Sequence, residues 1–251
     1  RDTTSVLMER FRKEIHNPYG IEPVQLFPTR EKVNEVNYRY FNQLKKDTTE
    51  KKNYNLKITI ESRDLENPLV GESLQTDIER KIKSQLPIDD KLELCEGCQV
   101  ILVINLSIEE GLVNGSKGKV EGFNEVGPIV MFSNGVVKNI AIYTWEIDEG
   151  MYLVKATGLP LILGYACTIH RSQGMTLPMA IIDIGKNVFT GSGGYGQIYV
   201  ALSRVQSLDG LRIINFDPTR IRCHPKVIEY YRNIDKFPNV DSPPNSNGST
   251  S

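Results

Sequence analysis

The sequence predicts an α/β fold in which a parallel sheet is flanked by helices and interrupted by a small β-rich insertion. Two patterns of strand, turn and helix, one near each end of the chain, predict the parallel sheet. A middle stretch of short apolar runs separated by tight turns predicts the insertion. The 251 residues, 39% hydrophobic and 24% charged, are enough to bury the core of one large domain or two modest ones, so a mainly disordered chain is excluded.

The first elements are a helix and then half of a βαβ unit. Residues 5–16 (SVLMERFRKEIH) are predicted as a helix, which the Asn-Pro-Tyr-Gly sequence at 17–20 ends. VQLF at 24–27 is a short apolar run typical of a buried strand. After a Pro-Thr turn, residues 30–44 (REKVNEVNYRYFNQL) repeat apolar side chains at helical spacing.

The same order of elements returns near the end of the chain. AIIDI at 180–184 predicts a strand, a Gly-rich loop follows, a helix is expected near 195–206, and LRIINF at 211–216 predicts another strand. Strands that alternate with helices assemble most naturally into a parallel sheet covered by helices.

The middle of the chain predicts a small β-barrel inserted into this domain. CQVILVINL at 98–106 is a strand, GLVNGSKGKVEGF at 111–123 places turn residues between apolar positions, and IVMFSNGVVKNI at 129–140 carries an Asn-Gly hairpin signal. The last stretch, 237–251, is rich in Pro, Ser and Asn and is expected to be a disordered tail.

The net charge of -1 conceals an uneven distribution. Residues 1–60 carry 12 basic and 8 acidic side chains, residues 61–150 carry 8 and 17, and residues 151–251 carry 10 and 6. Two basic flanks therefore enclose an acidic middle, and only the flanks are plausible phosphate-facing surfaces. The alternative is an ordinary solvated acidic region between two nearly neutral segments.

Signals for membranes, disulfides and zinc are weak. No apolar stretch reaches the roughly 18 residues of a membrane span, and the N-terminus lacks the apolar run of a signal peptide, so we expect an intracellular protein. Four cysteines are too few for a disulfide framework, and Cys95 and Cys98 have no second pair with which to bind zinc, so buried reduced thiols are expected. The chain does not begin with Met, and we expect it to be a piece of a longer polypeptide.

A phosphate-binding loop is missing from the sequence. The nearest string, GSKGKV at 115–120, has Val where Ser or Thr would bind magnesium, and it lies between two predicted strands instead of opening a helix. We interpret it as a barrel hairpin with Lys117 and Lys119 near a phosphate backbone. An acidic metal-binding pair at the end of an apolar strand is also missing, so no metal site is predicted and the chain alone cannot form a complete NTPase site.

The segment YACTIHRSQGMTL at 165–177 offers small polar groups beside one cation, Arg171. In an extended conformation Thr168, His170 and Ser172 point the same way, and in a helix Thr168 and Ser172 share a face. Either arrangement presents a row of donors to a sugar-phosphate backbone. The alternative is that Thr168 and Ser172 cap a helix while His170 is an incidental surface residue.

The segment GQIYVALSRV at 196–205 predicts a packed helix that carries a guanidinium. An apolar stripe leaves Gln197 and Arg204, seven residues apart, together on one flank. A guanidinium on a rigid element suits the stabilisation of charge on a transferring phosphoryl group. The alternative is a surface Arg that pairs with a carboxylate.

Five strings, in the order in which they occur, resemble the second motor domain of RecD-like and Pif-like DNA helicases of superfamily one. The resemblance runs from about residue 21 to about residue 233 and is carried by LFPTREKVNEVN, LCEGCQVILVINL, GLVNGSKGKVEGF, YACTIHRSQGMTL and GQIYVALSRVQSLDGLRIINFDPTRI. It implies a RecA-like domain at 21–96 and 151–234, an inserted Src-homology-three-like barrel at 97–150, a helix and linker from a preceding domain at 1–20, and a tail at 235–251.

The resemblance also implies roles for individual residues. Arg204 is expected to be the arginine finger that reaches the γ-phosphate of ATP. The interdomain ATP cleft is expected to include Gln173, Gly174, Arg30 and Gln197. Single-stranded DNA phosphates are expected to contact Thr29, Thr168, His170, Arg171, Ser172, Lys117 and Lys119, although the resemblance leaves open whether Thr29 and Arg30 touch nucleotide or DNA.

Two features depart from the family pattern. Arg171 stands where Lys is frequent, and the loop at 190–196 looks longer than usual.

The implied function is an ATP-dependent 5′ to 3′ DNA helicase of which this chain is one half. The expected partners are single-stranded DNA and the first RecA-like domain of the same polypeptide, which would bind most of the ATP and the Mg²⁺. The isolated chain is expected to hydrolyse no ATP, and the expected location is the nucleus or another compartment that contains DNA. The alternative is a non-catalytic adaptor in which the barrel binds nucleic acid or protein and the RecA-like part is a scaffold.

Overall fold

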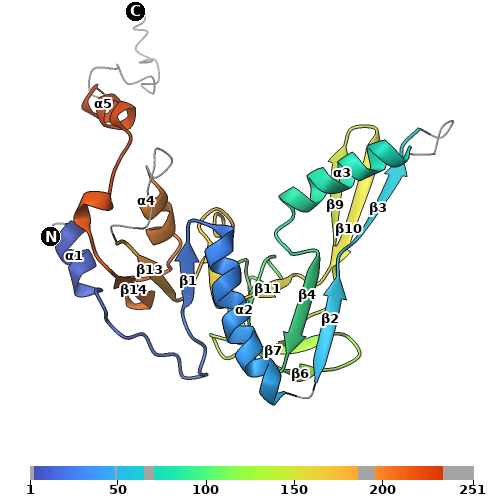
Figure 1. The fold of residues 1–251 in the computed structure, drawn as a ribbon, viewed down its shortest axis with the longest axis horizontal. Coiled ribbons are helices and arrows are strands. Elements are labelled where there is room, and N and C mark those ends of the chain that lie inside the picture. Colours follow the sequence, from blue (N-terminus) through green and yellow to red (C-terminus); the bar gives the residue numbers. More distant parts are fainter. Residues whose placement is uncertain (1–2, 49, 65–70, 186–195, 234–251) are drawn as a thin grey trace, which may run out of the picture.

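A four-stranded parallel sheet forms the centre of one half of the molecule and confirms the predicted α/β class (Figure 1). The computed structural model describes residues 3–48, 50–64, 71–185 and 196–233. The strand order is β12-β1-β13-β14, and every neighbouring pair is parallel. The strands are β1 (Val24–Phe27), β12 (Ala166–Thr168), β13 (Ala180–Asp183) and β14 (Leu211–Ile214).

Short apolar runs form these strands because the sheet is covered. Val24 and Leu26 of β1 are buried, as expected for a central strand of a parallel sheet. The helix α2 (Arg30–Asp47) follows β1 and packs against it and against β12 with the buried side chains Val33 and Val36. A shorter helix, α4 (Gln197–Leu202), buries Ile198 and Ala201 in the same core.

The N-terminal segment is part of the sheet edge, although the sequence predicted a helix and linker there. The helix α1 (Thr3–Glu9) is shorter than the predicted 5–16, and Phe11 then forms a parallel bridge with Ile213 of β14. Arg10 is buried, and its guanidinium donates to the backbone carbonyls of Leu211 and Asp209, each at 2.9 Å. The helix ends early because the Arg10 carbonyl and the Arg12 amide form hydrogen bonds with Ile213 of β14 instead of continuing the helix.

A five-stranded antiparallel sheet of order β11-β5-β6-β7-β8 corresponds to the predicted inserted barrel. Its strands are β5 (Gln99–Leu102), β6 (Lys117–Phe123), β7 (Pro128–Phe132), β8 (Val137–Asn139) and β11 (Leu161–Leu163). The predicted Asn-Gly hairpin is confirmed between β7 and β8, where Gly135 has a φ of +86°. A second apolar cluster, which includes Val120, Val130 and Phe132, forms the core of this part.

A third sheet, which the sequence did not predict, lies at the far side of the molecule beside α3 (Figure 1). Its strand order is β3-β10-β9, formed by β3 (Lys57–Ser62), β10 (Tyr152–Gly158) and β9 (Tyr143–Glu149). The helix α3 (Glu72–Gln85) contributes Ile78 and Ile82 to the same apolar cluster as β10. An antiparallel pair of strands, β2 (Lys51–Asn55) and β4 (Lys91–Cys95), connects this region to the five-stranded sheet.

These pairings cross the predicted boundaries of the insertion. The strand β9 lies inside 97–150 but pairs with β10 and not with the five-stranded sheet, whereas β11 lies outside that range and pairs with β5. The division of the chain into domains therefore stays a prediction.

Three of the four cysteines agree with the expectation of buried thiols. Cys95, Cys98 and Cys167 are buried and free, but Cys223 is exposed. The helix α5 (Pro225–Asn233) follows near the end of the described chain. Most of the loop at 190–196 and all of the predicted tail at 235–251 fall on residues 186–195 and 234–251, outside the described residues. Among the residues that are described, no helix is both long and apolar enough to cross a membrane.

Candidate nucleic-acid and nucleotide site

Two segments that the sequence singled out meet at the carboxyl ends of neighbouring strands. Phe27, the last residue of β1, is in register with Thr168, the last residue of β12, and the Ile169 amide donates to the Phe27 carbonyl at 2.9 Å. The turn that carries Thr29 and Arg30 and the loop at 168–174 therefore start side by side. Ligands of parallel α/β sheets bind preferentially at this edge.

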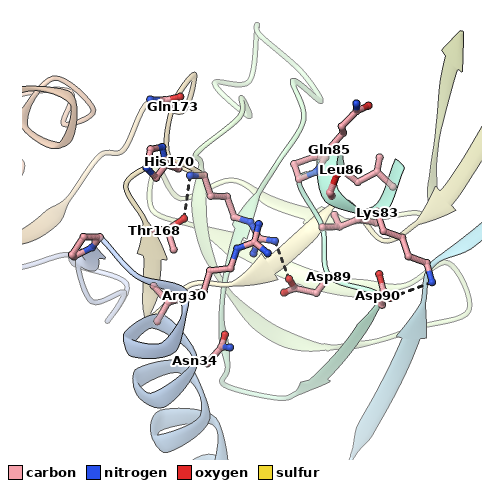
Figure 2. A pocket seen from close by; sticks show the side chains of 16 residues that line it. Arg30, Asn34, Lys83, Gln85, Leu86, Asp89, Asp90, Thr168, His170 and Gln173 are labelled. Carbon is pink, nitrogen blue, oxygen red and sulfur yellow. Dashed lines mark hydrogen bonds and ion pairs between the residues drawn. The ribbon is translucent and has the colours of Figure 1, made fainter. Parts of the chain in front are cut away.

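A pocket of about 710 Å³ lies at this edge (Figure 2). Three segments line it: residues 28–34 from the start of α2, residues 168–173 from the loop after β12, and residues 83–90 from the end of α3 and the segment that follows. Arg30, Thr168, His170, Arg171 and Gln173 from the predicted site all line the pocket. The structure thus brings five of the twelve predicted site residues together in one pocket.

The loop after β12 is a tight turn, neither the extended strand nor the helix that the sequence offered as alternatives. The Thr168 hydroxyl accepts a hydrogen bond from the Arg171 amide at 3.1 Å, and the Ser172 amide donates to the Thr168 carbonyl at 2.9 Å. His170 and Gln173 are exposed at the turn. Gly174 has a φ of +80°, in the left-handed region that favours glycine, and ends the turn.

Ser172 does not occupy the position that the sequence predicted. Its side chain is completely buried, and its hydroxyl donates to the Ile169 carbonyl at 2.8 Å. The turn points Ser172 into the core, so this hydroxyl stabilises the loop and is not displayed to a DNA phosphate in this structure.

Thr29 and Arg30 stand at the beginning of α2 and are both exposed. Thr29 occupies the position before the helix, but its side chain makes no capping hydrogen bond, which leaves the hydroxyl available. Arg30 points into the pocket (Figure 2). No ion pair of Arg30 with a carboxylate is present within the described ranges.

Two other cations of the pocket are paired with adjacent aspartates. Arg171 Nη2 lies 2.9 Å from Asp89 Oδ1, and Lys83 Nζ lies 3.3 Å from Asp90 Oδ2. Both pairs are partly exposed, with 28% and 51% of the Arg171 and Asp89 side chains accessible. The pocket therefore holds three strong cations and two carboxylates.

Arg204 lies just beyond α4 and does not line the pocket. The predicted helix ends at Leu202, so Arg204 is not on a helix flank with Gln197, which is the first residue of α4. Instead, the Arg204 carbonyl accepts from the Leu177 amide at 2.9 Å, and this bond ties it to the chain that follows Gly174.

The Arg204 guanidinium makes local contacts only. It donates to the Val200 carbonyl at 3.2 Å and to the Ser203 hydroxyl at 3.1 Å. None of the described carboxylates forms an ion pair with Arg204, so the alternative of a surface Arg paired with a carboxylate is not observed. A partly exposed guanidinium of this kind remains available to an anion.

The two lysines of β6 differ in exposure, and only Lys117 is placed away from the predicted phosphate contact. Lys117 is completely buried, its ammonium donates to the Glu22 carbonyl, and burial lowers its pKa to about 7. It therefore faces the segment before β1 and cannot meet a phosphate backbone in this structure. Lys119 is partly exposed and lies 3.1 Å from Glu121.

Sequence reasoning missed the residues that close the pocket. Asn34 could have been predicted from the sequence, because this residue stands four positions after Arg30 and thus on the same face of α2. Lys83, Asp89 and Asp90 gave no signal, since they come from a segment with no chemical motif that packs here only in three dimensions. No group of three or more His, Cys, Asp or Glu side chains in the described part of the chain could hold a metal ion.

Known proteins resemble this chain in both sequence and structure. A family model described as DNA helicase Pif1, 2B domain, matches residues 78–123. Human ATP-dependent DNA helicase PIF1 is 44% identical over 157 residues, which are 61% of this chain and 24% of the human protein. The crystal structure of Pif1 helicase from Candida albicans is 27% identical with a TM-score of 0.64, covering 92% of this chain and 53% of that one.

The chain is therefore similar to Pif1 helicases in sequence and in fold.

This Pif-like domain spans about a quarter of the length of the human relative and about half of the solved Candida chain. A crystal structure of Bacteroides Pif1 bound to ssDNA is also similar, with a TM-score of 0.54 and 25% identity over 92% of this chain and 49% of that one. The 2B match begins within α3, upstream of the predicted insertion boundary at 97, and it includes Lys83, Asp89 and Asp90. The wall of the pocket that sequence reasoning missed therefore lies within the residues that match the 2B model.

Proposed function

We propose that this chain is the C-terminal motor domain of an ATP-dependent DNA helicase that moves 5′ to 3′. The observation that carries the proposal is the pocket at the carboxyl edge of the parallel sheet, where Arg30, Thr168, His170 and Gln173 meet in a Pif-like domain. The human relative is named an ATP-dependent DNA helicase, which supports the reaction class. We infer that the protein is located in a compartment that contains DNA.

Single-stranded DNA is the proposed ligand of the carboxyl edge. Thr29, Thr168, His170 and Arg171 offer hydroxyl, imidazole and guanidinium groups to a sugar-phosphate backbone, and none of them reads base identity by itself. The Bacteroides Pif1 structure, which is bound to ssDNA, supports this assignment. Binding through phosphates predicts that affinity falls steeply as salt concentration rises.

ATP is the proposed substrate, held mainly by the first motor domain. The string at 115–119 leads into β6 and not into a helix, and Lys117 is buried, so the described chain has no phosphate-binding loop of its own. We propose that the first domain also holds Mg²⁺. From this chain, Gln173, Gly174, Arg30 and Gln197 would face the nucleotide, and Arg204 would stabilise charge on the γ-phosphoryl group when the two domains close.

The decisive experiment replaces Arg204 by Ala in the complete protein. A trans arginine of this kind typically contributes about 10³–10⁵ in rate, so R204A should lose that much of its DNA-stimulated ATP hydrolysis. Binding of a single-stranded oligonucleotide should remain near the unmodified level, because Arg204 lies outside the pocket. Arg232→Ala on α5, which removes the same charge from an exposed helix, is the matched control and should retain hydrolysis.

Near-normal ATP hydrolysis by R204A would contradict the assignment of the arginine finger. A second measurement adds the first motor domain in trans to the 251-residue chain. ATP hydrolysis that requires both domains supports the motor function. If the sequence upstream of residue 1 in the complete protein contains no phosphate-binding loop, the non-catalytic adaptor is favoured instead.

A further inference from the structure

The pocket at the carboxyl edge is a basic site that an acidic segment partly neutralises. Its strong cations are Arg30, Lys83 and Arg171, and its carboxylates are Asp89 and Asp90, so the charge of these groups is +1. Without the two carboxylates it would be +3. Both aspartates lie in the short connection between α3 and β4, while Arg30 and Arg171 come from the parallel sheet side.

Asp89 is held in place independently of its ion pair. Two side chains that precede it in the connection, Leu86 and Ile88, are buried in the main apolar cluster, with 7% and 5% exposed. This anchoring fixes the backbone of the segment at the rim of the pocket. The Asp89 carboxylate therefore stays beside Arg171 and competes with any other anion for the same guanidinium.

We propose that the Asp89–Arg171 ion pair is an acidic latch that a nucleic-acid phosphate must displace before Arg171 can bind it. The proposal rests on the proposed binding of single-stranded DNA and adds a residue that weakens it. The latch joins the loop after β12 to the α3–β4 connection across 82 positions of sequence. Phosphate binding at Arg171 thus releases one of the ties between the parallel sheet and the 2B region.

The test measures binding of a fluorescein-labelled 20-nucleotide oligo-dT to the 251-residue chain by fluorescence anisotropy at 50 and 200 mM salt. Asp89→Asn keeps the shape of the side chain and removes its charge. Because half-exposed ion pairs contribute little, we expect D89N to bind about 2- to 5-fold more tightly at the lower salt concentration. The gain should shrink at the higher concentration, where exposed charges are screened.

Two variants separate the latch from a general charge effect. Asp77→Asn removes a carboxylate from α3 that pairs with Arg80 at 3.0 Å and does not line the pocket, so its affinity should equal that of the unmodified chain. Asp90→Asn removes a carboxylate from the same connection but leaves Arg171 paired, so it should gain less than D89N. Thermal melting of each variant confirms that the fold is retained.

Each outcome of these measurements decides the proposal. Equal gains in D89N and D90N overturn the latch, since pocket charge alone would then explain them, and a D89N affinity equal to that of D77N overturns it as well. In an Arg171→Gln background the D89N gain should disappear, and a persistent gain contradicts the pairing. If no variant binds oligo-dT, single-stranded DNA binding by this chain fails together with the latch, whereas binding without a D89N effect rejects the latch alone.

Discussion

Lys117 provides a quantitative test of the structure, because an ammonium group is enclosed in the fold with one backbone carbonyl as its partner. Burial lowers the pKa of Lys117 from its usual 10.5 to about 7, while the nearby Glu22 carboxylate opposes the shift. Between pH 7 and pH 10.5 the unfolded chain therefore binds a proton that the folded chain does not. In that window stability rises with pH by about 1.4 kcal/mol per unit from this group, and the dependence ends below about pH 7.

Lys117→Met removes the titrating group and keeps a side chain of similar length. The free energy of unfolding of the unmodified chain minus that of K117M should increase by about 2–3 kcal/mol between pH 7.5 and pH 9.5. Loss of the hydrogen bond to the Glu22 carbonyl adds about 1 kcal/mol against the variant at every pH. At pH 7.5 the K117M variant gains stability relative to the unmodified chain, because it no longer has to bury an amine that is charged in the unfolded chain.

Urea unfolding followed by the fluorescence of Trp145, the single tryptophan, measures these values. Other groups titrate in the same range, including Cys95, whose pKa the hydrogen bond from Cys98 lowers to about 6. They are present in both proteins and cancel in the difference. A difference that does not change with pH would refute the reasoning, since Lys117 would then titrate alike in the folded and unfolded chain.

Two further substitutions test the packing of the two main sheets. Arg10→Ala removes buried charged hydrogen bonds to carbonyls at and just before β14, and it should lower the free energy of unfolding by about 2–4 kcal/mol, whereas Lys13→Ala at an exposed position should change it little. Gly118→Ala places a Cβ 2.4 Å from a side chain of β7 and should lower the free energy of unfolding by about 1–3 kcal/mol. Gly122→Ala, whose Cβ would meet nothing within 4 Å, should lower it by less. Urea unfolding measures all four variants, and equal losses of stability within either pair would contradict the packing.

The sequence was a good guide where local pattern decides structure. The apolar runs that became β1, β13 and β14 were recognisable because the strands of a covered parallel sheet are rich in apolar residues, and the Asn-Gly signal identified the β7–β8 hairpin. The motif at 168–173 was recognised by its residue types, but its turn was not, because the turn depends on Ile169 pairing with Phe27 from a distant strand.

Contacts between distant segments explain the remaining differences. Lys117 looked like a surface cation because nothing near it in sequence reveals that the segment before β1 covers it, 95 positions away. Asp89 meets Arg171 across 82 positions and has no motif of its own. Ser172 faces the core because the turn directs its hydroxyl to the Ile169 carbonyl, which the residue types of the motif do not reveal.

The position of β12 in the sheet has a consequence for the order of folding. Gln25 of β1 pairs with Ala166 of β12, 141 positions later, so this parallel ladder closes a loop that contains both other large sheets. Closing a loop of that length in an unfolded chain is entropically costly, and contacts between distant residues form slowly. We expect the enclosed antiparallel hairpins to fold first and shorten the effective loop, so that the pocket edge, which depends on the β1–β12 pairing, is among the last parts of the protein to form.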